Sequence, residues 1–502
     1  MPEITIQLDN VVRKQNEIDT NKSTGPDGIP GYILKKFSHV FAPILTKLFR
    51  KFYNNGIVPA ELKTANVVPL FKCGDRLQPQ NYRPISLTPI IAKIFEGIFH
   101  DALIAHIEIN SIICPEQHGF LKGRSTNTNL ISFWNDITLM AKDTKEITII
   151  YTDAKKAFDS VPHDLLLHKC QNLGITGKNL AFIRSFLSDR EQRVSLNNTK
   201  SRKIPIKSGV PQGGVLSGLL FILYVNDLPQ CLQYLKASIY ADDAKFYGPT
   251  LNPTSEDLIQ KDLNEIARWC EKWRIRLHEQ KCFALHYRPR FCTNPPPQYY
   301  INDSPLPMKH STTDLGVIIC DNLRFNEQIA HSCKKATRQI NIIRRSFQSR
   351  SPSFLATMFK LYVRPQIEYC GQLWNPVYMG ESDSIEKVQN RFTRMLRHGS
   401  RMTPSERNEC LGITDHKTRR LRGDLIYMFK LLHDENLFTV ASDDRTRGHS
   451  KRVMIENSRN NIRKHSFTQR NTMLWNSLPD NVVNADSLNI FKNRLDLFLM
   501  TV

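Results

Sequence analysis

Two adjacent aspartates between short apolar runs constrain this chain more than any other feature. Asp242 and Asp243 lie in the segment 239–247, which reads Ile-Tyr-Ala-Asp-Asp-Ala-Lys-Phe-Tyr. This pattern predicts a β-hairpin with the acidic pair at its tight turn. Neighbouring carboxylates repel one another and lose hydration when they pack together, so a bound divalent cation such as Mg²⁺ would relieve a real cost. Taken alone, however, such a pair is more often a solvated turn.

A third carboxylate, Asp153, ends the segment Glu-Ile-Thr-Ile-Ile-Tyr-Thr, residues 146–152, which predicts a buried β-strand. A carboxylate at the end of a central strand, beside a hairpin that carries two more, can hold two metal ions about 3.5–4 Å apart for phosphoryl transfer. A second interpretation stays open for this residue, because aspartates often cap helices and a helix is expected to begin near Ala154.

A Gly/Pro/Gln-rich loop leads into an apolar helix within residues 208–227. In such a loop the backbone and a side-chain amide can approach a planar ligand closely. The apolar run Val215–Val225 is far shorter than the roughly 20 residues that span a bilayer, so it predicts a core helix.

These segments and several others resemble the reverse transcriptases of non-LTR (LINE-type) retrotransposons, most of all the jockey group. The resemblance covers nearly the whole chain, and the segments follow in the family's order. They are Lys22–Ile29 ahead of the fingers, Asn81–Leu87 and Gln117–Ser125 in the fingers, and motifs A to E at Asp153–Asp159, Gly209–Phe221, Tyr240–Asp243, Trp273–Lys281 and Leu315–Val317.

The resemblance implies an RNA-directed DNA polymerase with a mixed α/β (α+β) right-hand fold. It predicts an N-terminal extension and fingers in residues 1–145, and a palm with a fingers insertion in 146–328. A helical thumb is expected in 329–400 and a basic, mainly helical region in 401–502. A primer 3′-hydroxyl would attack the α-phosphate of a dNTP on an RNA template, with two Mg²⁺ ions, or Mn²⁺ as a substitute, as cofactors.

The resemblance also implies roles for individual residues. Asp153 and Asp242 would bind both metal ions, with Asp243 as a further acid at that site. Phe158 would be a steric gate, because an aromatic ring under the sugar clashes with a 2′-hydroxyl. The bland alternative for Phe158 is ordinary core packing.

Other residues would contact the incoming nucleotide. Gln212 would lie near the nascent base pair, and Arg83 and Lys72 would hold the triphosphate through charge-assisted hydrogen bonds. Lys281 would protonate the pyrophosphate leaving group as a general acid.

Three positions depart from the family's usual residues without removing a metal ligand. His278 stands where motif D commonly has asparagine, Gly218 where motif B often has proline, and Gly214 where serine is frequent. We expect these departures to affect rate, fidelity or packing rather than the type of reaction.

The charge of the chain fits a polyanion partner. It contains 69 Lys+Arg against 48 Asp+Glu, a formal net charge of +21, which predicts nucleic-acid binding that weakens with salt. Residues 331–350 hold six basic residues and no acid, as expected of a thumb helix along the primer–template backbone, with a solvated helix face as the alternative. The candidates are Lys334, Lys335, Arg338, Arg344 and Arg345.

The remaining expectations concern location and partners. Eleven scattered cysteines without zinc-ligand spacing, and a polar N-terminus, predict an intracellular protein of cytoplasm and nucleus with no membrane contact. Expected partners are template RNA, primer DNA, dNTPs and an element-encoded RNA-binding protein. The basic residues of 401–502 favour template-RNA binding over a purely structural role.

Only some twenty residues precede the first motif, so the endonuclease that jockey-type polyproteins carry there is expected to be missing. Three other readings stay open: an RNA-dependent RNA polymerase, a group II intron maturase, and a decayed or domesticated nucleic-acid-binding protein without catalysis. The first usually has glycine before the acidic pair and lacks the aromatic gate. No maturase-like nuclease tail is visible, and the intact carboxylates argue against the third.

Overall fold

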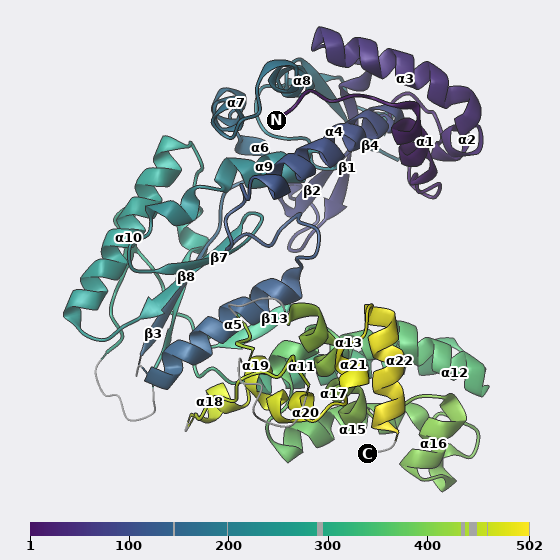
Figure 1. The fold of residues 1–502 in the computed structure, drawn as a ribbon, viewed down its shortest axis with the longest axis vertical. Helices are drawn as coiled ribbons and strands as arrows, with labels where there is room; N and C mark the ends of the chain where they lie inside the picture. The colour runs from purple at the N-terminus through teal and green to yellow at the C-terminus, as the bar shows by residue number, and fades with distance from the viewer. Residues whose placement is uncertain are drawn as a thin grey trace.

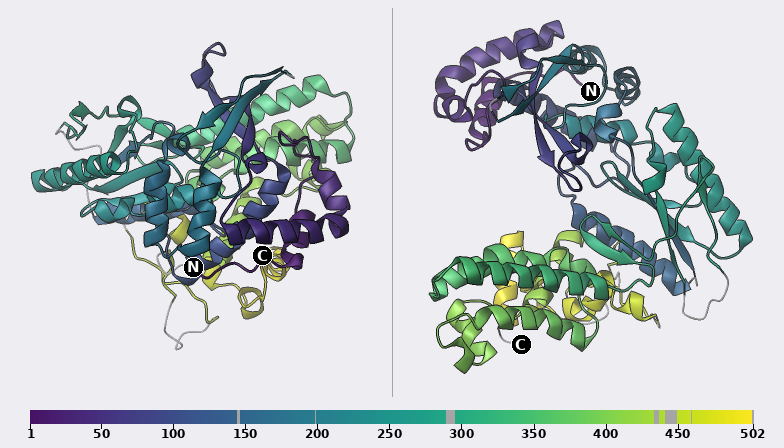
Figure 2. Two further views of the ribbon diagram at one scale, coloured as in Figure 1. Left: turned by 90° about the horizontal axis from the view of Figure 1, so that it is seen from above. Right: turned by 180° about the vertical axis from the view of Figure 1, so that it is seen from behind.

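The computed structural model describes residues 1–143, 146–197, 199–288, 295–432, 437–440, 449–458 and 460–500. A four-stranded sheet lies between an N-terminal lobe and a C-terminal lobe, which occupy opposite ends of the longest axis (Figure 1). The view from behind in Figure 2 shows the same order, with the sheet joining the two lobes along one side. Helices and strands are both abundant, as the predicted α/β class requires.

The N-terminal lobe combines the first hundred residues with a later segment of the chain. Its sheet has the strand order β2-β1-β4-β5; β6 also pairs with β4, and β1 pairs with β4 in parallel. Its elements are α1 (Leu8–Asn16), α2 (Gly31–Lys36), α3 (Ser38–Asn55), β1 (Thr64–Phe71), β2 (Tyr82–Leu87), α4 (Ile90–Ile109), α6 (Ala157–Ser160), α7 (His163–Asn172), α8 (Gly177–Leu187), β4 (Arg190–Leu196), β5 (Thr199–Lys200), β6 (Ile204–Ile206) and α9 (Ser217–Val225).

The central sheet is antiparallel and has the strand order β7-β8-β3-β9. Helices α5 and α10 lie on its two sides, and a small hairpin, β12–β13, leads out of it toward the C-terminal lobe (Figure 1). The elements are α5 (Thr126–Asp143), β3 (Ile147–Thr152), β7 (Lys236–Tyr240), β8 (Asp243–Pro249), α10 (Pro253–Lys272), β9 (Phe283–Tyr287), β10 (Tyr300–Ile301), β11 (Ser304–Pro305), β12 (Ser311–Asp314) and β13 (Val317–Cys320).

Strand β3 is buried because its alternate residues enter two different hydrophobic cores. Ile150 belongs to the core that contains α10 and most of the N-terminal lobe. Ile147 and Ile149 belong to the core that contains Phe133 and Trp134 of α5. Successive side chains of a strand point to opposite faces, so an apolar strand without polar alternation suits a sheet covered on both sides. The predicted strand before Asp153 is therefore confirmed.

The C-terminal lobe is helical. Its longest helix, α11, covers the basic segment that predicted a thumb helix, and a π-helical turn, Phe359–Val363, joins α12 to α13. The helices are α11 (Asn326–Ser346), α12 (Pro352–Met358), α13 (Arg364–Glu368), α14 (Gly371–Trp374), α15 (Met379–Thr393), α16 (Pro404–Leu411), α17 (His416–Leu431), α18 (Asn461–Lys464), α19 (Phe467–Arg470), α20 (Thr472–Asn476), α21 (Asp480–Val483) and α22 (Leu488–Leu499).

The last hundred residues pack against α5 of the central sheet. Ile131 of α5 enters the apolar core formed by α17 and the helices that follow it. The Nη1 of buried Arg463 donates to Asn135 Oδ1 at 2.8 Å and to Thr138 Oγ1 at 3.1 Å, both on α5. Among the helices of the described residues, none is long and apolar enough to cross a membrane.

Candidate active site

The three aspartates of the predicted metal site lie at one end of the central sheet. The predicted hairpin is present: in β7–β8 Tyr240 pairs with Asp243, so Ala241 and Asp242 form the turn and Asp243 is the first residue of β8. In the adjacent pair of strands Thr152 lies opposite Ala244, and Asp153 follows Thr152 directly. Asp153 and Asp243 both line a pocket of about 350 Å³.

The sequence reasoning missed the residue that holds the turn. Ala241 has a φ of +58°, a left-handed conformation that costs free energy for a residue with a Cβ. The side-chain Oε1 of buried Gln117 accepts hydrogen bonds from Ala241 N at 2.9 Å and from Gly119 N at 2.8 Å. A Cβ on Gly119 would lie 2.6 Å from Ala241 N, so only glycine allows this approach. Gln117 and Gly119 fell within a recognised motif, but their role needs the tertiary contact.

Reduced hydration, and then repulsion, raise the pKa values of the acidic pair. Desolvation by the surrounding protein raises the pKa of Asp242, and the charge of Asp153 raises it further. The same two causes, with Asp242 and Asp314 as additional negative neighbours, raise the pKa of Asp243 to about 6. Both side chains nevertheless keep solvent contact, so a ligand can reach them. A divalent cation would offset this repulsion, and the carboxylates therefore fit the expected metal.

The protein supplies only part of a metal coordination shell. Within the described residues, no group of three or more His, Cys, Asp or Glu side chains is close enough to hold an ion by itself. Asp153 and Asp242 could supply carboxylate oxygens, while a substrate would have to complete the shell. This matches the habit of Mg²⁺ at phosphoryl-transfer sites, where phosphates serve as ligands.

Three predicted cations lie close to the carboxylates. The positive charges of Arg83, at the start of β2, and Lys72, just after β1, lower the pKa of Asp242. Lys281 Nζ lies 3.4 Å from Asp153 Oδ2. The backbone places Lys281 there, because His278 N donates to the carbonyl oxygen of Asp153 at 2.7 Å. The structure thus brings Arg83, Lys72 and Lys281 to the site.

Phe158 packs between two other rings beside this site. Its ring stacks on Phe221 of α9 with centroids 4.4 Å apart, and meets the edge of Phe120 at 5.9 Å. The Phe158 carbonyl accepts from Val210 N at 2.8 Å, which joins motif A to motif B. Gly218 leaves room for Phe120, since a Cβ there would lie 2.4 Å from the ring. Glycine instead of proline at position 218 therefore allows the ring of Phe120 to pack there.

Gln212 lies in the loop before α9 and faces motif A. Its Nε2 donates to Asp159 Oδ1 at 3.2 Å, and its carbonyl accepts from Ser86 N of β2 at 2.7 Å. A Cβ on neighbouring Gly213 would lie 2.6 Å from Ser86 O, so the loop and β2 are in close backbone contact. Glu96 Oε2 accepts from Val215 N at 2.7 Å and holds the end of this loop from α4.

A family model described as "Reverse transcriptase (RNA-dependent DNA polymerase)" matches residues 72–337, which is more than half of the chain. The chain belongs to the reverse transcriptase family. Its central sheet and two lobes form the right-hand polymerase fold of that family.

Curated relatives come from non-LTR elements. The chain is 28% identical over 400 residues to a "Probable RNA-directed DNA polymerase from transposon X-element" of Drosophila melanogaster, covering 77% of this chain and 43% of the relative. It is 25% identical over 411 residues to the "RNA-directed DNA polymerase from mobile element jockey" of Drosophila funebris, covering 79% and 44%. The chain thus spans less than half the length of these relatives. A solved telomerase from Candida albicans in complex with a fragment of telomeric RNA is 13% identical, with a TM-score of 0.37 over 80% of this chain and 74% of that one.

A buried ion pair that the sequence did not predict lies next to Asp243. Lys245 lies two residues after Asp243 on β8, and its Nζ is 2.6 Å from Asp314 Oδ2 at the end of β12. Tyr151 OH donates to the same oxygen at 3.2 Å. Lys245 lowers the pKa of Asp243, whereas Asp314 raises it. The i, i+2 spacing on one strand face was the available signal.

The predicted thumb cations lie away from the carboxylates. Helix α11 belongs to the C-terminal lobe and buries Ala336, Ile340 and Ile343 on one side. The basic side chains occupy its exposed positions, and the structure does not bring them into the acidic cluster. They are Lys334, Lys335, Arg338, Arg344 and Arg345.

Proposed function

We propose that this chain is the polymerase part of a non-LTR retrotransposon protein and adds dNTPs to a primer 3′-hydroxyl on an RNA template. The observation that carries the proposal is the cluster of Asp153, Asp242 and Asp243 at one end of an antiparallel sheet, with Arg83 and Lys72 close enough to shift the pKa of Asp242. Negative side chains for cations and positive side chains for phosphates at one place are what nucleotidyl transfer requires.

Each side chain has a part in this proposal. Asp153 and Asp242 would hold Mg²⁺, with Asp243 next to them, and bound Mg²⁺ would supply Lewis acidity for the attacking and leaving oxygens. Arg83 and Lys72 bind and orient the triphosphate, because guanidinium and ammonium donate to phosphate oxygens. Lys281, now paired with Asp153, is the candidate acid for the pyrophosphate.

In this proposal Phe158 and the rings that it contacts determine the selectivity for deoxyribose over ribose. Phe158 stacks on buried Phe221 and meets Phe120 edge-on, so moving it to admit a 2′-hydroxyl would cost packing against Phe221. Gln212, fixed through its carbonyl to Ser86, contacts the base pair that forms.

We assign the N-terminal lobe to the fingers, the central sheet to the palm and residues 329–400 to the thumb. Helix α5 falls in the range predicted for the fingers, yet it packs on β3, β7 and β8. We therefore place it with the palm. The exposed cations of α11 would follow the backbone of the primer–template duplex, and residues 401–502 cover the outer side of α5.

We also propose that the protein acts inside the cell, in cytoplasm and nucleus, with an element-encoded RNA-binding protein as a further partner. The cysteines within the described residues are free thiols, as suits a reducing compartment.

Primer extension on an RNA template with Mg²⁺ and dNTPs tests the proposal. The parent and Asp257→Asn, which removes an exposed carboxylate from α10, should extend the primer, whereas Asp242→Asn should not. Failure of the parent, with salt-sensitive RNA binding retained, would replace the proposal by that of a decayed or repurposed binding protein.

A further inference from the structure

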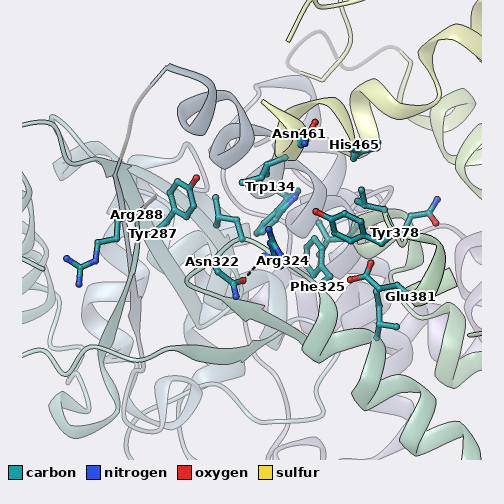
Figure 3. A pocket seen from close by; sticks show the side chains of 16 residues that line it. Trp134, Tyr287, Arg288, Asn322, Arg324, Phe325, Tyr378, Glu381, Asn461 and His465 are labelled. Carbon is teal, nitrogen blue, oxygen red and sulfur yellow. Dashed lines mark hydrogen bonds between the residues drawn. The ribbon is translucent and has the colours of Figure 1, made fainter. Parts of the chain in front are cut away.

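A second pocket, of about 370 Å³, lies where the central sheet meets the C-terminal lobe (Figure 3). Its lining comes from α5, the end of β9, the loop after β13, the start of α15 and α18. It is far from the carboxylates: Tyr287 in its wall pairs with Ile147, the first residue of β3, whereas Asp153 follows the last. Six strand residues separate the two sites by about 20 Å at about 3.3 Å each.

Aromatic rings form the walls of this pocket. Trp134 of α5 and Phe325, the residue before α11, pack with centroids 4.6 Å apart. The guanidinium of Arg324 lies 6.0 Å from the centroid of the Tyr378 ring, which is 52% exposed. Figure 3 shows Trp134, Arg324, Phe325 and Tyr378 close together around the cavity. Rings and guanidinium planes of this kind stack on unpaired nucleobases.

Unused polar groups accompany the rings. Glu381, in the first turn of α15, lines the pocket, and its carboxylate has no hydrogen-bond or ion-pair partner within the described residues. Trp134 is only 4% exposed, and its indole N–H donates to no other group in the part of the chain that the structure describes. Asn322 Oδ1 accepts from Arg324 N at 2.9 Å, which directs the amide of Asn322 (Figure 3).

We propose that this pocket binds an unpaired guanine base of RNA. A carboxylate accepts from N1–H and the N2 amino group of guanine together, whereas adenine and uracil present no such pair of donors. The pocket is large enough for a nucleotide. Arg324 supplies a positive charge for the adjoining phosphate.

The position of the pocket favours RNA over other ligands. Phe325, just before α11, and Ile329, in its first turn, line the pocket. The exposed face of this helix carries Lys334, Lys335 and Arg338. A strand held by these cations could place one base in the pocket at the start of the same helix. The inference rests on the proposed function, because it takes RNA as the polymer that α11 holds.

Binding of short RNAs tests the inference. A labelled 12-nucleotide oligouridylate with one central guanosine should bind about tenfold more tightly than one with a central adenosine, at one fixed salt concentration. Glu381→Gln should remove this preference and leave the affinity for the adenosine RNA unchanged. Asp383→Asn, which neutralises an exposed carboxylate on the same helix outside the pocket, should keep the preference.

Two further measurements separate the possible failures. Tyr378→Leu should also weaken binding of the RNA that contains guanosine, because the stacking ring is lost although the carboxylate of Glu381 remains. Equal affinity of the parent for both RNAs, or a preference that survives Glu381→Gln, would overturn the inference. Extension of oligo(dT) on poly(rA), a template without guanine, is measured in parallel: its absence in the parent would refute the proposed function instead.

Discussion

The contact between Gly218 and Phe120 yields the sharpest prediction about packing at the active site. A Cβ at position 218 would lie 2.4, 2.6 and 2.7 Å from three ring atoms of Phe120. Ordinary carbon–carbon contacts are about 3.5–4.0 Å, so Gly218→Ala must displace the ring. Phe120 has a φ of +58° and is 52% exposed, so the ring has room to move outward at some cost.

Two opposing effects set the magnitude. Alanine in place of glycine stabilises a helix by up to about 1 kcal/mol, and Gly218 lies in the first turn of α9. Overpacking costs about 1–3 kcal/mol; the close approach to the ring increases this cost and the ring's partial exposure reduces it, so about 2 kcal/mol applies here. Gly218→Ala should therefore destabilise the parent by about 1 kcal/mol. In a Phe120→Ala background the obstacle is gone, and the same change should stabilise by up to about 1 kcal/mol.

A double-mutant cycle followed by urea denaturation measures this reversal of sign. Gly423→Ala in α17 is the matched control, because its nearest contact is a side-chain nitrogen at 3.4 Å. It should have the same effect in both backgrounds. The steric reasoning is refuted if Gly218→Ala has the same sign with and without the ring of Phe120.

Three further outcomes are expected. Phe158→Ala should admit ribonucleotides, because the ring that would clash with a 2′-hydroxyl is gone; unchanged selectivity in single-nucleotide incorporation would show that the gate is elsewhere. In the absence of Mg²⁺ and above about pH 6, Asp243→Asn should raise the free energy of unfolding by on the order of 1 kcal/mol after allowance for solvent screening. The reason is that the pKa of Asp243, about 6, reflects desolvation and negative neighbours that destabilise its charged form. A lower melting temperature of the variant would contradict this. His416 is buried beside Arg420 and Arg419, and desolvation lowers its pKa to about 3, below the unfolded value. Its contribution is therefore fully present above about pH 6.5 and is lost by about 1.4 kcal/mol per unit as the pH falls toward 3, so His416→Gln should flatten thermal stability between about pH 6.5 and 4.5. Equal slopes in both proteins would refute this assignment.

The acidic turn and the strand before Asp153 were predictable because both are local. A hairpin brings Tyr240 and Asp243 together within four residues, and an apolar run that ends on an acid signals a buried strand. Such patterns depend on side chains that are neighbours in sequence.

The supports of the site depend on distant contacts and could not be predicted in the same way. Gln117 reaches Ala241 across 124 residues, and Lys245 reaches Asp314 across 69. The sequence alone does not distinguish a buried glutamine or lysine from an exposed one. Only the fold shows that these side chains hold the turn and the charge of Asp243.

The sequence also could not predict which side of the sheet α5 covers. This helix is apolar on several faces, because one side packs on the central sheet and another on the last hundred residues. Its periodicity therefore indicates a buried helix without saying which elements bury it.

The packing of α5 changes how the role of residues 401–502 can be tested. Deleting them would expose Ile131 and leave Asn135 and Thr138 without the guanidinium of Arg463, so the palm helix itself would be destabilised. Weaker RNA binding by such a truncated protein would then report damage to the palm as readily as a lost RNA contact. Replacing exposed basic residues such as Lys417 and Lys464 by uncharged residues leaves the buried contacts of Arg463 intact. A smaller salt dependence of RNA binding in those variants, with unchanged thermal stability, is the result that a direct RNA contact requires.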